Sequence, residues 1–121
     1  MYKFLDKHNL GVPFCYIHPY KQLAAKHLVD NVEDWVEAVI IFGSAVTYAH
    51  HYDSDLDVCI VGIPSGEFSS RNLRLKGEAY DFIIVESYAL LKQKSDDDFS
   101  CIYRDIMDGG VVVYDKKNNA S

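Results

Sequence analysis

Residues 36–61, VEAVIIFGSAVTYAHHYDSDLDVCIV, contain the pattern that decides the fold. The stretch opens with VEAVIIF (residues 36–42), whose β-branched residues predict a strand buried on both faces. It closes with DLDVCIV (residues 55–61), which predicts a second strand. Between them, residues 45–49 predict a short helix that begins directly after Gly43-Ser44, and the polar residues 50–54 predict a loop.

Two aspartates open the second predicted strand. Residues i and i+2 of a strand point to the same face, so Asp55 and Asp57 should project side by side. Adjacent carboxylates repel each other, and burial among apolar residues disfavours their charged form further. A divalent cation would offset both effects, and carboxylate oxygens are the ligands that Mg²⁺ prefers. The alternative interpretation is a pair of solvated aspartates at the start of an edge strand.

A third carboxylate lies in the apolar run AYDFIIV (residues 79–85), which predicts another strand. An aspartate inside a buried strand needs a physical reason, because aspartate is rarely buried without a partner. If this strand lies beside that of Asp55 and Asp57, Asp81 completes a three-carboxylate cluster. Otherwise Asp81 caps a turn after Gly77.

Gly43 and Ser44 follow the first predicted strand. A glycine lets the backbone approach a ligand closely. If a helix begins here, its free N–H groups favour an anion such as phosphate, and Ser44 adds a hydroxyl donor. The alternative is an ordinary turn that ends the strand.

The rest of the chain predicts helices from Pro19 to about residues 31–34 and over residues 88–94, the second with Ser87 as its N-cap. Residues 95–98, SDDD, should begin a further helix that runs over about residues 99–107, and residues 111–114 should form a last strand. This order predicts an α/β (α+β) fold, a small mixed β-sheet with helices packed on it. We expect residues 1–121 to form a single domain, with a lead-in over residues 1–18 and a flexible tail over residues 115–121.

Composition narrows the class of partner. The net charge of −6 argues against nucleic acid as the main partner, although Arg71, Arg74 and Lys76 could form a local basic patch. The three cysteines show no metal-binding spacing. We find no signal-peptide pattern and no apolar run long enough to span a bilayer, so we expect a cytoplasmic protein without a membrane partner.

The run FGSAVTYAHHYDSDLDVCIV resembles the signature of the DNA polymerase beta-like nucleotidyltransferase superfamily, and most of all its minimal, single-domain members. That signature is an apolar strand, Gly-Ser, about ten residues, Asp-x-Asp, and a third carboxylate on a later strand. The residues that match it are Gly43, Ser44, Asp55 and Asp57, with Asp81 in the place of the third carboxylate. The resemblance runs from the helix at Pro19 to Tyr114 and implies the polymerase beta-like nucleotidyltransferase fold.

The resemblance implies an enzyme. Asp55, Asp57 and Asp81 would bind two Mg²⁺ ions, and Gly43 and Ser44 would contact the phosphates of a nucleoside triphosphate such as ATP. An acceptor hydroxyl would attack the α-phosphate and displace pyrophosphate, with Asp81 as the general base. Minimal members often act as the antitoxin of a toxin–antitoxin pair, so the resemblance also implies a HEPN-domain protein partner, with a homo-oligomer as the alternative.

The chain departs from the minimal members just after Gly-Ser. Several of them carry arginines there, where this sequence has Ala45, Thr47 and Tyr48. His50 and His51 could replace those arginines as phosphate donors, or could be ordinary loop residues. A second hypothesis therefore stands beside the enzyme: a module with the same fold that binds a nucleotide or a partner without turnover.

Overall fold

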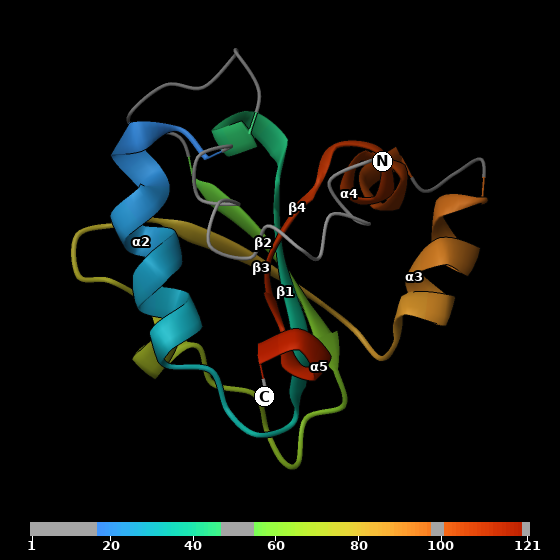
Figure 1. Cartoon of the computed structure of the whole chain (residues 1–121), viewed down its shortest axis with the longest axis horizontal. Helices are drawn as coiled ribbons and strands as arrows, with labels where there is room; N and C mark the ends of the chain where they lie inside the picture. The colour runs from blue at the N-terminus through green and yellow to red at the C-terminus, as the bar shows by residue number, and fades with distance from the viewer. Residues whose placement is uncertain (1–16, 47–54, 98–100, 120–121) are drawn as a thin grey trace.

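The computed structural model describes residues 17–46, 55–97 and 101–119. These residues form a four-stranded mixed sheet with helices on both of its faces (Figure 1). The elements are the helix α2 (Pro19–Asp30), the strand β1 (Val36–Phe42), the 3-10 helix η3 (Gly43–Val46), β2 (Leu56–Gly62), the 3-10 helix η4 (Arg71–Leu73), β3 (Tyr80–Val85), α3 (Tyr88–Ser95), α4 (Cys101–Gly109), β4 (Val111–Asp115) and α5 (Lys116–Asn119). The predicted fold class is confirmed.

The strand order in the sheet is β3-β2-β1-β4. β1 is antiparallel to both of its neighbours, β2 and β4, whereas β2 and β3 are parallel. The C-terminal end of β1 therefore meets the N-terminal ends of β2 and β3 at one edge of the sheet. At this edge Phe42 pairs with Asp57, and Asp57 pairs with Asp81.

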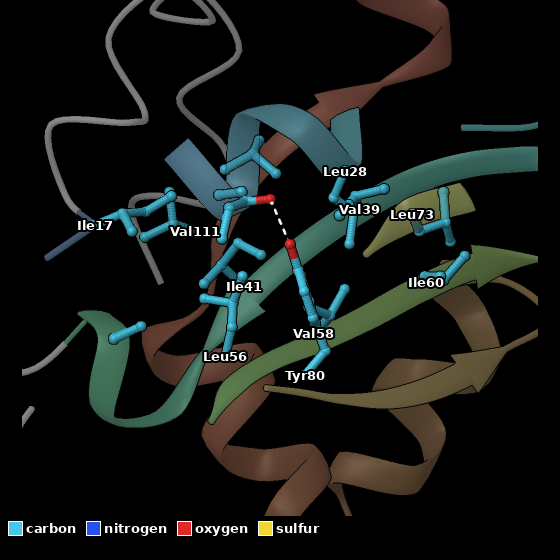
Figure 2. Packing of buried hydrophobic residues seen from close by; sticks show 14 of the residues in the cluster. Ile17, Leu28, Val39, Ile41, Leu56, Val58, Ile60, Leu73, Tyr80 and Val111 are labelled. Atoms are coloured by element: carbon cyan, nitrogen blue, oxygen red, sulfur yellow. Dashed lines mark hydrogen bonds between the residues drawn. The ribbon is translucent and has the colours of Figure 1, made fainter. Parts of the chain in front are cut away.

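Helix α2 packs on one face of the sheet over a large apolar cluster (Figure 2). Alternate residues of each strand enter this cluster, as the two-residue period of a strand requires. The Tyr80 hydroxyl donates a hydrogen bond to the Ala24 carbonyl oxygen of α2 at 3.1 Å, drawn as the dashed line in Figure 2. The residues buried in this cluster include Ala24, Ala25, Leu28, Val39, Ile41, Leu56, Val58, Ile60 and Tyr80.

Helices α3 and α4 cover the opposite face (Figure 1). Leu91 of α3 and Ile106 of α4 are fully buried there, together with Ile40 and Cys59 of the central strands. Because side chains of β1 enter clusters on both faces, the prediction of a strand buried on both sides is confirmed. Cys59 is a small core residue.

Two element boundaries differ from our expectations. Ser95 was expected to begin a helix but instead ends α3, because its buried hydroxyl donates to the Lys92 carbonyl oxygen at 2.7 Å. Residue 115 was expected to begin a flexible tail, but Asp115 is the last residue of β4, paired with Ala38 and buried. α5 follows it, capped where the Asp115 carboxylate accepts a hydrogen bond from the Lys117 backbone N–H.

The remaining expectations concern shorter segments. The helix expected over residues 45–49 is a single 3-10 turn, Gly43–Val46, as far as the structure describes it. Ile17 of the expected lead-in is fully buried under α2. The α3 N-cap is Ser87, whose hydroxyl oxygen accepts a hydrogen bond from the Leu90 N–H. Across the described ranges, no helix has the length and apolar character needed to cross a membrane.

Candidate active site

Asp57 and Asp81 are direct neighbours at the edge of the sheet where β2 and β3 begin. The residues that flank them, Leu56 and Val58 on β2 and Tyr80 on β3, point into the cluster under α2. Side chains alternate along a strand, so the two carboxylates lie on the opposite face, the one covered by α4. The pairing that the sequence left open is present: the third carboxylate lies beside the second.

The carboxylates interact electrostatically. Asp57 is half-buried, whereas Asp55 and Asp81 are exposed. Burial raises the pKa of Asp57 above its usual value of 3.8, and the negative charges of Asp81 and Asp55 raise this pKa further. Asp55 lies just before the first residue of β2 rather than within the strand. Asp57 therefore lies within the electrostatic influence of both of the other predicted carboxylates.

Gly43 forms the turn against which Asp57 packs. Its φ of 76° lies in the left-handed region that residues with a side chain rarely adopt. A Cβ at this position would also collide with the Asp57 carboxylate oxygen Oδ2. Glycine is thus required twice, by the backbone conformation and by the space that Asp57 occupies. Ser44 follows in η3 and is half-buried beside the carboxylates' edge of the sheet.

The chemistry of these groups suits a divalent cation. Carboxylate oxygens are the preferred ligands of Mg²⁺, and a cation would offset the burial and repulsion that disfavour a charged Asp57. Within residues 17–46, 55–97 and 101–119, however, no three His, Cys, Asp or Glu side chains are placed so that they could hold one ion as they stand. Repulsion keeps like charges apart, so the side chains would have to turn toward a bound cation.

A cavity beside the Gly43 turn has an acidic wall. Gly43 and Val46 line one side of this cavity, and Asp105, Asp108 and Gly109 of α4 line the other. The sequence pattern alone does not single out these α4 aspartates. Their spacing of three residues places them on one helix face, and this was the available signal. A phosphate that enters this cavity would need a cation to offset the negative charge around it.

Several side chains outside this group pack against other parts of the fold or lie on its surface. Tyr80 is a core residue that joins α2 to the start of β3, as its hydrogen bond to Ala24 shows. Trp35 packs edge-to-face on Phe68. Arg71, Arg74 and Lys76 are exposed around η4, with the Arg74 guanidinium over the rings of Tyr80 and Phe82. Residues 47–54, among them His50 and His51, lie outside the described residues.

Comparison with known proteins agrees with this geometry. The family model described as "Polymerase beta, Nucleotidyltransferase" matches residues 25–119, well over half of the chain. The matched segment contains the Gly43-Ser44 turn and all three carboxylates. Among curated proteins, no sequence matches the chain significantly. With a family model that spans the sheet, the turn and the acidic edge, the chain belongs to the polymerase beta nucleotidyltransferase family.

Proposed function

We propose that this protein transfers a nucleoside monophosphate from a nucleoside triphosphate, such as ATP, to an acceptor hydroxyl in a Mg²⁺-dependent reaction. Membership of the family supports a nucleotidyltransferase-type function in general. The observation that carries the finer proposal is the pairing of Asp57 with Asp81 beside the Gly43 turn. It supports the proposal because two carboxylates lie next to a turn whose backbone N–H groups could donate to a phosphate.

Each residue has a distinct part in the proposed reaction. Asp55, Asp57 and Asp81 would hold two Mg²⁺ ions, which when bound neutralise the triphosphate and activate the acceptor oxygen. The backbone N–H groups and the Ser44 hydroxyl in the turn after Gly43 would donate to the phosphates. Asp81 would accept the proton of the acceptor hydroxyl. A bond then forms between the acceptor oxygen and the α-phosphorus, and the bond to the leaving pyrophosphate breaks.

The electrostatics of Asp57 support a ligand-binding role over a purely structural one. Its raised pKa means that the folded protein disfavours the charged carboxylate. Its burial alone would favour an apolar or neutral residue at this position. A bound cation reverses this preference, so the arrangement is most stable when the ligand is present.

We further propose that a separate protein presents the acceptor hydroxyl, and that a HEPN-domain protein has this role in a toxin–antitoxin pair. The resemblance to minimal nucleotidyltransferases supports this proposal. A second copy of the chain is the other candidate partner. The net charge of −6 argues against nucleic acid as the main acceptor.

A module that binds a nucleotide or a partner without turnover is the second candidate. Two observations favour it. Ala45, which follows the Gly-Ser pair where minimal members often carry arginines, is buried and apolar. The three carboxylates are also not gathered as a ready metal site in the described part of the chain. In this case the protein would bind the Mg²⁺–nucleotide complex and release it unchanged.

Calorimetric titration with nonhydrolysable ATP and GTP analogues, with and without Mg²⁺, tests the site. We expect saturable binding that requires Mg²⁺ and is lost in the double variant Asp55→Ala/Asp57→Ala. The matched control is Asp30→Ala/Asp34→Ala, which removes two exposed aspartates away from the site. If neither the ATP nor the GTP analogue binds, the proposal of a stand-alone enzyme is refuted. Binding without transfer to any acceptor, including a HEPN-domain protein, would favour the binding module.

A further inference from the structure

Lys21 in the first turn of α2 is buried and forms a partly buried ion pair with Glu78. The Lys21 Nζ donates to Glu78 Oε2 at 2.7 Å. The Lys21 side chain is 3% exposed and that of Glu78 is 27% exposed. Within the described residues, Glu78 is the one acidic group that Lys21 contacts. The two residues are far apart in the sequence, so this contact depends entirely on how α2 docks on the sheet.

Glu78 lies just before β3, in the segment that leads to Asp81. Ala79, the next residue, accepts a hydrogen bond at its carbonyl oxygen from the Leu56 N–H of β2 at 2.8 Å. Tyr80 is in turn held by α2 through the Ala24 carbonyl, as Figure 2 shows. Three successive residues before Asp81 are therefore each tied to α2 or to β2.

The start of α2 also contacts the opposite side of the candidate site. The His18 backbone N–H donates to the Ala45 carbonyl oxygen in η3 at 2.7 Å. Ala45 directly follows the Gly43-Ser44 turn. The N-terminal end of α2 thus lies next to both the Gly-Ser turn and the entry to β3, the two parts that a phosphate and a metal ion would have to bridge.

Stability alone is a poor explanation for this ion pair. Removing two charges from water is unfavourable, and buried ion pairs can often be replaced by apolar residues of similar size without loss of stability. A buried pair does fix relative position, because each charge requires the other as its partner. The contribution that distinguishes Lys21 from an apolar residue is therefore the placement of Glu78.

We propose that Lys21 is a positioning residue: through Glu78 it fixes the entry to β3 and so holds Asp81 beside Asp57. This inference rests on the proposed function, because it gives Lys21 a role in assembling the same carboxylate site. Lys21 acts from the α2 face of the sheet, whereas the carboxylates lie on the α4 face. It would touch neither the nucleotide nor the metal ions.

The test compares the wild type with Lys21→Met/Glu78→Met, in which both charges are replaced together. We expect an unchanged or higher unfolding temperature, but an affinity for the Mg²⁺–ATP analogue that is at least tenfold weaker. We also expect hydrogen exchange at the Leu56 amide to become at least tenfold faster, because its acceptor Ala79 is no longer held in place. Lys26→Met removes an exposed lysine of the same helix and should change none of these quantities.

Two further variants complete the test. Lys21→Arg preserves the ion pair and should retain the affinity of the wild type. If the double variant does not fold, Lys21→Met replaces it with the same readouts, since the partly exposed Glu78 can remain hydrated after its partner is removed. Unchanged nucleotide affinity and unchanged Leu56 exchange would overturn the inference.

If even the wild type binds no Mg²⁺–nucleotide, the proposed function has failed. Leu56 exchange then decides the positioning role alone: faster exchange supports it and unchanged exchange rejects it.

Discussion

At the edge of the sheet where β2 and β3 begin, the two faces of the sheet differ in how their charged side chains are compensated. On the α2 face, Lys21 and Glu78 carry opposite charges in a 2.7 Å contact, so the protein itself compensates the burial of the Lys21 ammonium. On the α4 face, Asp57 lies among the like charges of Asp55 and Asp81, which together with burial raise its pKa. The first region is complete without a ligand. The second has no compensating positive charge of this kind among the described residues, and this contrast supports the proposal that it binds a cation.

The largest expected effect comes from removing the charge at the centre of the acidic region. Asp57→Asn keeps the shape of the side chain but removes a proposed metal ligand and a negative charge. We expect transfer, measured as kcat/KM, to fall roughly 10²- to 10³-fold, the size of effect typical when one preorganised electrostatic group is lost. Asp30→Asn is the control. If kcat/KM fell less than threefold in Asp57→Asn, Asp57 would have no essential part in the proposed mechanism.

The paired region should respond to the loss of one partner more than to the loss of both. Glu78→Ala leaves the Lys21 ammonium buried without a counter-charge, and we expect it to lower the free energy of unfolding by about 2–4 kcal/mol. Lys21→Met should be milder, because Glu78 is partly exposed and can remain hydrated. Urea denaturation of both single variants measures this asymmetry. Equal effects would contradict our description of Lys21 as the more deeply buried partner.

A substitution at Gly43, in the turn beside Asp57, should have the next largest effect. Gly43→Ala forces a side chain into a left-handed conformation and against the Asp57 carboxylate. We expect the free energy of unfolding to fall by about 1–2 kcal/mol. Gly66→Ala is the matched control, because no atom lies within 4 Å of a Cβ built there. Its effect should stay within about 0.5 kcal/mol, since it meets no packed neighbour.

The smallest effect is the pH dependence of stability that Asp57 contributes. Because its pKa is raised in the folded state, the folded protein binds the Asp57 proton more tightly than the unfolded chain does. Stability must therefore fall as the pH rises from about the unfolded value of 3.8 through the folded pKa. Unfolding temperatures of the wild type and Asp57→Asn, measured across this range, should diverge in favour of the variant as the pH increases. Saturating Mg²⁺ should reduce the difference, and a constant difference at every pH would contradict the assignment.

Much of the candidate site could be predicted from local sequence. Asp57 and Asp81 interrupt apolar strands, and a carboxylate in such a pattern is conspicuous without any structure. The close packing of Gly43 on Asp57 could not be predicted, because it depends on the pairing of β1 with β2. Lys21 does carry a local signal: it lies three and seven residues before Ala24 and Leu28, on the buried face of α2. Its partner Glu78 carries none, since the contact joins distant segments.

The amino-acid sequence by itself determined the strands, the strand-ending Gly-Ser turn and the acidic residues at the strand ends. These are local properties, set by β-branched composition, by side-chain alternation and by the conformational freedom of glycine. The tertiary structure alone decided that β3 lies parallel to β2 with Asp81 in register with Asp57, that α4 adds an acidic wall, and that α2 holds the entry to β3. Those features depend on contacts between segments far apart in the chain, which form only when the helices dock on the sheet.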